Sequence, residues 1–595
     1  MILLLCILLS IAEGIEFQNG IVNTTYGRIQ GSLRQEGGFS VYQFLKVPYA
    51  QPPLGSMRFR KPQPPVPWNG VLNATKPGLS CIQKISKSYR NFLPNMDVSE
   101  DCLYMNIYVP SGSSTSNIPI MVYIHGGGYY KKSANLHDGA RISAVSDVVV
   151  ILINYRLGMF GFLSTGDDQS RGNYGLWDQI QALEWIQGNI RNFGGDPSRV
   201  TVFGHSAGGY SIGLLLLSKH SLGLFHRAIA TSGLGLNKRA ITHDARNAAF
   251  RVAKFVGCYN ASVEFDSRAL NSSHIVSCLK SKTPEEILVA TGKMQTSYNR
   301  YDFIMRPGPV IDGDFLLDSP EHIMNNPESQ GFRTFRSADV MAGTNDEDGW
   351  LLKSKLKDMQ KTYNFSLDNG VSFSAMCDGV VRSLVRDYFH SDATIANKIC
   401  KRYSRNSSIV DQGHSTLDMY GDVLYAAPAV QTLRKHRSAM TPLKESERRN
   451  TYHFLFVHKP SFPVISSRRS WLTGAQHGDE VWFIFKNKNF DYTEEELKLN
   501  DGFVRYLTNF AKSGNPNGKD LETFWPAFDS ETESYLKINR TMTVEEHMFK
   551  DRMTFWLETV PSLQHDSTSS HGVFLEYSAI LSIIIIYDLC ESLLQ

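Results

Sequence analysis

One short segment combines a strand, a tight turn and a helix around a serine. Residues 200–203 are apolar and β-prone, Gly204-His205-Ser206-Ala207-Gly208 follows at once, and a leucine-rich run occupies 212–217. A G-x-S-x-G pattern between a strand and a helix places its serine on a strained turn, with the hydroxyl exposed above a sheet. Such a serine can act as the nucleophile of an acyl transfer. The pattern alone also fits an ordinary serine in a strand–helix turn, so the prediction depends on partners elsewhere.

An acyl-transfer serine needs donors that stabilise the oxyanion of the tetrahedral intermediate. The sequence H-G-G-G at 125–128 follows an apolar run at 118–124. Successive glycines let backbone N–H groups point at one spot, so we expect Gly127, Gly128 and the N–H of Ala207 to be the donors. A phosphate-cradling loop is not favoured, because no G-K-[ST] follows.

The serine also needs a general base and a carboxylate that orients it. Residues 343–349 contain Asp346, Glu347 and Asp348 in a row, and residues 474–480 (G-A-Q-H-G-D-E) contain His477. The order serine, acid, histidine is that of α/β-hydrolases. The acids could instead form a solvated turn, and the histidine could be an ordinary loop residue. Both alternatives are less favoured, because the glycine loop, the serine motif, the acidic run and the histidine motif occur in the correct order, each in the expected local context.

The composition is that of a globular protein, with 42% hydrophobic and 20% charged residues. The formal net charge is +3, and no basic stripe with interleaved aromatics is present, so nucleic-acid binding is not indicated. The acidic run at 346–348 does not have the spacing of a calcium loop. We therefore expect a small-molecule substrate and neither a metal nor a cofactor.

Apolar segments that alternate with helical ones predict the fold class. Helical spacing of Leu176, Ile180, Leu183, Ile186 and Ile190 indicates a core-facing helix. Strands are expected at 118–124, 148–153, 200–203, 227–230, 340–343 and 452–457. This alternation predicts one large α/β domain over residues 15–563, with long insertions and a mostly parallel central sheet that has helices on both faces.

The ends of the chain and its cysteines predict export. Residues 1–14 are an apolar stretch with a small-x-small end, which is typical of a signal peptide although it lacks a basic residue. Six cysteines between the two ends and seven N-x-S/T sequons suit an oxidising, secretory route. Residues 564–595 form a tail whose apolar run at 577–587 is too short to span a bilayer but loosely matches a GPI-anchor signal. A partner-binding tail is the alternative. The expected location is secreted or on the extracellular surface.

Four segments together resemble a known family, the type-B carboxylesterases, which include cholinesterases. They are F-G-G-D-P-S-R-V-T-V-F-G-H-S-A-G-G (193–209), E-D-C-L-Y-M-N-I-Y-V-P (100–110), F-L-K-V-P-Y-A-Q-P-P (44–53) and 474–480. The resemblance covers roughly residues 20–560. It implies an α/β-hydrolase fold, with Ser206 as nucleophile, His477 as general base and Asp348 as the acid. Glu is more common than Asp at that position, and Glu347 is the alternative acid.

The resemblance also implies two disulfides and an ion pair. The disulfides are Cys81–Cys102 and Cys258–Cys278, and the ion pair is Arg58–Glu100. The third bridge of cholinesterases has no counterpart here. Cys377 and Cys400 are expected to pair with each other, from parity alone.

Several positions that bind choline in cholinesterases carry other residues here. Phe92 stands in place of the choline-stacking Trp, His205 in place of the Glu before the nucleophile, and Leu351 and Leu352 in place of the aromatic pair after the acid. The aromatic residues of the acyl pocket are only half retained, as Phe303 and Met305. We therefore expect a carboxylesterase that cleaves neutral, apolar esters through an acyl-enzyme intermediate on Ser206. The alternatives are an acetylcholinesterase-like choline-ester hydrolase and a non-catalytic, neuroligin-like adhesion protein.

Overall fold

The computed structural model describes residues 17–36, 38–85, 97–112, 117–259, 271–297, 307–405, 408–462 and 469–564. The predicted signal peptide, almost all of the tail, Phe92, Phe303 and Met305 lie outside these residues. Among the described residues, no helix has the length and apolar character that crossing a membrane requires.

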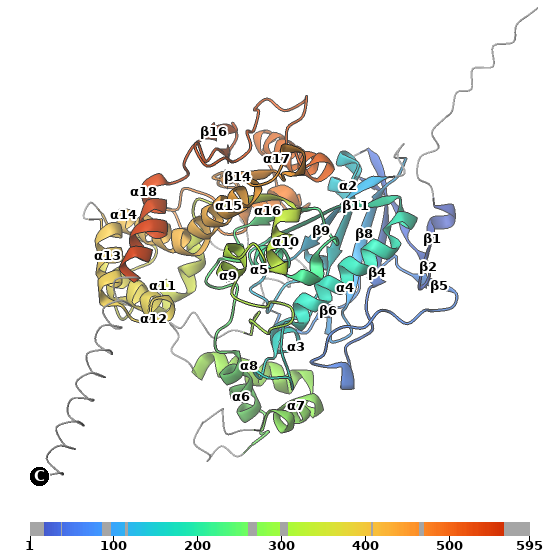
Figure 1. Ribbon diagram of the computed structural model, residues 1–595, viewed down its shortest axis with the longest axis horizontal. Helices are drawn as coiled ribbons and strands as arrows, with labels where there is room; N and C mark the ends of the chain where they lie inside the picture. Colours follow the sequence, from blue (N-terminus) through green and yellow to red (C-terminus); the bar gives the residue numbers. More distant parts are fainter. Residues whose placement is uncertain are drawn as a thin grey trace, which may run out of the picture.

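A single large sheet of eleven strands runs through the molecule (Figure 1). In spatial order the strands are β16 (Thr543–Glu545), β15 (Tyr535–Ile538), β14 (Thr451–Phe456), β13 (Asp339–Asn345), β12 (Arg227–Thr231), β11 (Gly195–His205), β9 (Ile118–Ile124), β10 (Val149–Ile153), β8 (Tyr104–Pro110), β4 (Phe39–Pro48) and β3 (Ser32–Glu36). All neighbours from β15 to β10 are parallel. The pairings at both edges are antiparallel. The prediction of a mostly parallel central sheet is confirmed.

Each strand expected from the sequence is present: β9 has the predicted bounds, β11, β12 and β13 are longer, β10 is one residue shorter, and β14 is shifted by one residue. The predicted helix is α4 (Tyr174–Asn189), whose apolar positions are buried. Residues that succeed one another along a strand point to opposite faces of a sheet. In β9, Ile120 and Val122 therefore lie in one core and Met121 and Tyr123 in the other.

Helices cover both cores, as predicted. The core of Ile120 and Val122 includes side chains of α4, α5 (Ala207–Leu215) and α15 (Ala427–Met440). The core of Met121 and Tyr123 includes side chains of α2 (Ala140–Ser146), α16 (Asp479–Ile484) and α17 (Glu494–Ser513).

The remaining elements lie in insertions between the strands and at the two ends of the described chain. Figure 1 shows α6, α7 and α8 as one group beneath the sheet and α11 to α14 as another beside it. The helices are α3 (Gly158–Phe162), α6 (Ala245–Phe255), α7 (Ser272–Ser281), α8 (Pro284–Ser297), α9 (Pro320–Asn325), α10 (Gln330–Ser337), α11 (Lys353–Met359), α12 (Arg382–Tyr388), α13 (Ala393–Tyr403), α14 (Ile409–Gly421) and α18 (Lys550–Thr554). The short strands outside the main sheet are β1 (Ile21–Thr24), β2 (Gly27–Gln30), β5 (Val71–Asn73), β6 (Ser80–Cys81) and β7 (Val98–Ser99).

All three expected cysteine pairs form disulfides: Cys81–Cys102, Cys258–Cys278 and Cys377–Cys400. The expected ion pair is also present, with Arg58 Nη2 2.5 Å from Glu100 Oε2 and both side chains largely buried.

Candidate active site

Ser206 occupies the turn between β11 and α5. Its backbone has φ 58° and ψ −122°, a sparsely populated conformation that a non-glycine residue adopts only when its surroundings enforce it. Here the Ser206 N–H donates to the Thr231 carbonyl (2.9 Å), and the Ser206 carbonyl accepts from Tyr210 N (2.8 Å). The side chain is 9% exposed and lines a cavity. The turn therefore presents the hydroxyl to that cavity.

Gly204 and Gly208 are required by close packing of the turn against β9. A Cβ atom on either residue would overlap the carbonyl oxygen of Ile124. The G-x-S-x-G pattern therefore needs glycine at both positions.

His477 and Asp348 form a hydrogen-bonded pair beside the same cavity. His477 Nδ1 lies 2.8 Å from Asp348 Oδ1. Asp348 Oδ2 accepts from Ser232 Oγ (2.8 Å) and from Asn345 N (2.9 Å), which fixes the carboxylate just beyond β13. The other ring nitrogen, His477 Nε2, is buried and has no hydrogen-bond partner among the described residues. His477 and Ser206 line the same cavity, so the histidine and the serine can act on one bound group.

The two acids next to Asp348 contact other groups. Glu347 Oε1 accepts from Thr473 N at 2.9 Å and lies 3.6 Å from His414 Nδ1. Asp346 Oδ1 accepts from Ala475 N at 2.7 Å. The geometry therefore favours Asp348 over Glu347 as the acid that orients His477.

The glycine loop after β9 lies against the serine turn. A Cβ atom on Gly126 would overlap the His205 carbonyl oxygen, so the loop and the turn are in direct contact. Gly127 (φ 112°) and Gly128 (φ 63°) have positive φ angles, and both line the cavity. Ala207 begins α5, and the first N–H groups of a helix have no acceptor within it. The three predicted oxyanion donors therefore come from segments that meet at Ser206.

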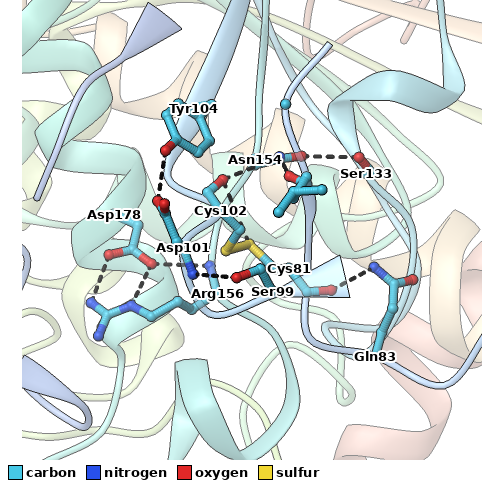
Figure 2. Close-up of a disulfide and its surroundings, with 12 residues drawn as sticks. Cys81, Gln83, Ser99, Asp101, Cys102, Tyr104, Ser133, Asn154, Arg156 and Asp178 are labelled. Carbon is cyan, nitrogen blue, oxygen red and sulfur yellow. Dashed lines mark hydrogen bonds and ion pairs between the residues drawn. A yellow bond between two sulfur atoms is a disulfide. The ribbon is translucent and has the colours of Figure 1, made fainter. Parts of the chain in front are cut away.

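Two residues that the sequence reasoning missed, Gln83 and Asn154, connect this loop to the Cys81–Cys102 disulfide (Figure 2). Gln83 Nε2 donates to the carbonyls of Cys81 (3.0 Å) and Lys132 (2.8 Å), and Lys132 N donates back to Gln83 Oε1 (2.7 Å). Asn154 Nδ2 donates to the Cys102 carbonyl (3.1 Å), and Asn154 Oδ1 accepts from Ser133 Oγ (3.1 Å). The disulfide thus anchors the segment that follows the oxyanion loop.

A second buried histidine–carboxylate pair lies next to the first. His205 Nδ1 is 2.6 Å from Glu480 Oε1, and Glu480 also accepts from Thr231 Oγ1 (2.8 Å) and Asn345 Nδ2 (2.6 Å). Although burial raises the pKa of Glu480, the charge of His205 and these hydrogen bonds outweigh it and bring the pKa to about 2. Burial lowers the pKa of His205, against the attraction of Glu480. Because Glu480 is ionised, Nδ1–H of His205 is the donor in this hydrogen bond.

The rings of His205 and His477 pack together, with centroids 4.5 Å apart. His205 itself lines the cavity. Of the two leucines in place of the family's aromatic pair, Leu351 lines the cavity, whereas Leu352 is buried in the core. The cavity has a volume of about 370 Å³, within the range typical of small-ligand sites.

The unusual protonation of Asp346 predicts a pH dependence of stability. Burial raises the pKa of Asp346 to about 8, and the charge of Glu347 adds to this. In the unfolded chain an Asp has a pKa of about 3.9, so between about pH 4 and 8 the folded state holds a proton that the unfolded state has released. The free energy of unfolding therefore falls as the pH rises through this window. Asp346→Asn, which cannot ionise, should become progressively more stable than the wild type between pH 5 and pH 8.

Chemical denaturation at both pH values measures this difference. The exposed Asp520→Asn provides the control, because a solvated carboxylate should give the same difference at both pH values. A difference for Asp346→Asn that does not grow with pH would contradict the prediction.

Comparison with known proteins agrees with the geometry. The model of the carboxylesterase family matches residues 18–556. Carboxylesterase 1F of Mus musculus is 34% identical over 574 residues, covering 91% of this chain and 94% of that protein. Liver carboxylesterase B-1 of Rattus norvegicus is 35% identical over 566 residues (91% and 94%), and liver carboxylesterase of Sus scrofa is 35% identical over 555 residues (90% and 92%). The chain has the α/β-hydrolase fold and belongs to the carboxylesterase family.

Proposed function

We propose that this member of the carboxylesterase family hydrolyses carboxylic esters through an acyl-enzyme intermediate on Ser206. The observation that carries the proposal is the His477–Asp348 pair: His477 lines the same cavity as Ser206, and its Nε2 has no hydrogen-bond partner among the described residues. Family membership over residues 18–556 supports the same reaction.

The roles follow from the chemistry of the groups. Ser206 Oγ attacks the ester carbonyl carbon while His477 Nε2 takes the hydroxyl proton, and Asp348 stabilises the imidazolium through Nδ1–H. The backbone N–H groups of Gly127, Gly128 and Ala207 stabilise the oxyanion of the tetrahedral intermediate. When this intermediate collapses, His477 gives its proton to the leaving alcohol. Water then attacks the acyl-enzyme with His477 as base, which releases the acid and restores Ser206.

A fluorophosphonate probe tests the proposal directly, because it reacts covalently with an activated serine. Stoichiometric labelling at Ser206 is expected. A protein that neither reacts with the probe nor hydrolyses esters would instead fit the adhesion alternative.

The site favours uncharged esters over choline esters. A cation–π contact with Trp is worth about 2 kcal/mol when it is desolvated. Here Leu351 lines the cavity at a position that is aromatic in cholinesterases, and His205 replaces a carboxylate. The value of kcat/KM for acetylcholine should therefore be no higher than that for its uncharged isostere, 3,3-dimethylbutyl acetate. Since 1.4 kcal/mol corresponds to a factor of ten, a preference of roughly tenfold or more for acetylcholine would show that a cation site exists.

The predicted signal peptide and the C-terminal tail support a proposal for the location of the protein. Residues 1–14 act as a signal peptide, residues 15–563 form the hydrolase domain, and residues 564–595 provide a GPI-anchor signal on a secreted or surface-attached glycoprotein. The three disulfides support the secretory route. Treating intact cells with a GPI-cleaving phospholipase should release the activity into the medium. Activity that stays bound, or that is in the medium beforehand, would exclude the anchor.

A further inference from the structure

His205 is a buried histidine next to the nucleophile, and the proposed reaction assigns it no role. Its backbone is fixed at the end of β11, where it pairs with Thr231 of β12. The residue is 3% exposed, and its ring centroid lies 4.5 Å from that of His477, with 53° between the two ring planes. The catalytic histidine therefore lies against a neighbour whose own position is set by the sheet.

A fully buried carboxylate fixes the His205 ring. Glu480 Oε1 accepts from His205 Nδ1 (2.6 Å) and from Thr231 Oγ1 (2.8 Å), and Glu480 Oε2 accepts from Asn345 Nδ2 (2.6 Å). His205, Thr231 and Asn345 are the last residues of β11, β12 and β13, three neighbouring strands of the sheet. Hydrogen bonds to an ionised group are also stronger than those between neutral groups. Glu480 is thus tied to three strand ends at once.

The ends of the same strands also hold the His477–Asp348 pair. Asn345 Nδ2 donates to the carbonyl of Gln476, the residue before His477, at 2.7 Å. Asn345 N donates to Asp348 Oδ2 (2.9 Å), and Ser232, which follows β12, donates to the same oxygen (2.8 Å). The two histidine–carboxylate pairs are therefore positioned by one common set of groups.

The bond to Asp348 fixes one atom of the His477 ring, Nδ1, at a distance of 2.8 Å. A flat ring that packs against His477 restrains its tilt as well. Two rings lie against it in the described part of the chain, Tyr425 at 5.0 Å and His205 at 4.5 Å. Of these, His205 is the nearer and is the one that Glu480 holds. The tilt matters because a misplacement of about 1 Å in a catalytic group can cost about 10² in rate.

We propose that His205 is a positioning residue: held by Glu480, its ring fixes the orientation in which His477 takes the proton of Ser206. In this role His205 acts through His477 and does not itself react with the ester. The inference rests on the proposed ester hydrolysis and adds a residue on which that reaction depends.

Removing the ring tests the proposal. His205→Ala should lower kcat and kcat/KM for 4-nitrophenyl acetate by similar factors of about 10², because the lost restraint acts on the transition state. Turnover is expressed per serine that the fluorophosphonate probe labels at completion, so a partial loss of folded enzyme cancels. The rate of labelling should fall with kcat, whereas its final extent per folded protein should not.

His205→Asn separates positioning from structural support. The Nδ2–H group of Asn can replace Nδ1–H of histidine in the bond to Glu480, but no ring then packs against His477. Thermal stability should therefore return toward the wild type, while kcat stays near that of His205→Ala. Wild-type kcat in His205→Asn would overturn the proposal, because the bond to Glu480 would then suffice without the ring. This variant also carries the test if His205→Ala does not fold.

A double-mutant cycle tests whether His205 acts through Glu480. Glu480→Ala leaves the His205 ring without its anchor, so it should also lower kcat. The double variant should have a kcat close to that of the less active single variant, since residues in one hydrogen-bonded network are not additive. A loss equal to the product of the two single losses would overturn the assignment of Glu480 as the anchor.

Another buried histidine–glutamate pair provides the matched control. His458 Nε2 lies 3.1 Å from Glu496 Oε1, the two side chains are 4% and 1% exposed, and neither residue belongs to the described lining of the cavity. His458→Ala should lower the stability but keep wild-type kcat per labelled serine. A loss of kcat as large as that of His205→Ala would show a general effect of breaking such a pair and would overturn the proposal.

The outcomes separate this inference from the proposed function. A wild-type protein that is labelled and hydrolyses esters, with an unchanged kcat in His205→Ala, would overturn the positioning role and leave ester hydrolysis standing. A wild-type protein that hydrolyses no ester and does not react with the probe would overturn both proposals.

Discussion

Replacing Ser206 by alanine is expected to lower kcat for ester hydrolysis by about 10⁶, the loss typical of removing a catalytic serine. The variant cannot form the acyl-enzyme, and only oxyanion stabilisation and substrate binding remain. Steady-state hydrolysis of 4-nitrophenyl acetate measures the effect, and the fluorophosphonate probe should no longer label the protein.

A second serine provides the control. Ser198 lies at the exposed end of β11, the strand that leads to Ser206, and its hydroxyl donates to Asp196. Ser198→Ala should keep wild-type kcat and full labelling. If Ser206→Ala unfolds at the same temperature as the wild type, its loss of activity comes from the missing hydroxyl and not from a loss of folded protein. Near-normal turnover by a folded Ser206→Ala would mean that another nucleophile performs the reaction.

The central strands could be predicted from the sequence because each is a local apolar run. Every side chain of β9 is buried, since helices cover both faces of the sheet, and such a run is visible without knowledge of its partners. The edge strand β16 is only partly buried, so it carries no such signal. Its place at the edge depends on pairing with β15, which the alternation of apolar and polar residues does not specify.

The residues of the proposed triad could be selected from the sequence for the same reason, whereas their surroundings could not. Ser206, Asp348 and His477 each lie in a short motif that has its own local context. The bond between His205 and Glu480 joins residues 275 positions apart, so neither motif alone reveals it.

Replacing Asp348, the acid of the proposed triad, is the second substitution expected to have a large effect on kcat. Asp348→Asn is expected to lower kcat by about 10⁴, because an amide in place of the carboxylate favours the wrong imidazole tautomer and cannot stabilise the imidazolium. The fold should tolerate the change, since the side-chain oxygen of Asn can still accept from Ser232 or from Asn345 N. Hydrolysis of 4-nitrophenyl acetate over a range of concentrations would show the loss mainly in kcat, with KM much less affected.

Glu347→Gln is the matched control, because it makes the same acid-to-amide change one residue away. Glu347 Oε1 accepts from Thr473 N, a bond that the glutamine carbonyl can retain, and Glu347 has no hydrogen bond to His477 among the described residues. Its effect on kcat should be smaller by orders of magnitude than that of Asp348→Asn. The reverse pattern, with near-normal activity in Asp348→Asn and a severe loss in Glu347→Gln, would show that Glu347 orients His477 during turnover. That result would require the 343–349 turn to rearrange when substrate binds, because the Asp348–His477 bond of 2.8 Å would have to break first.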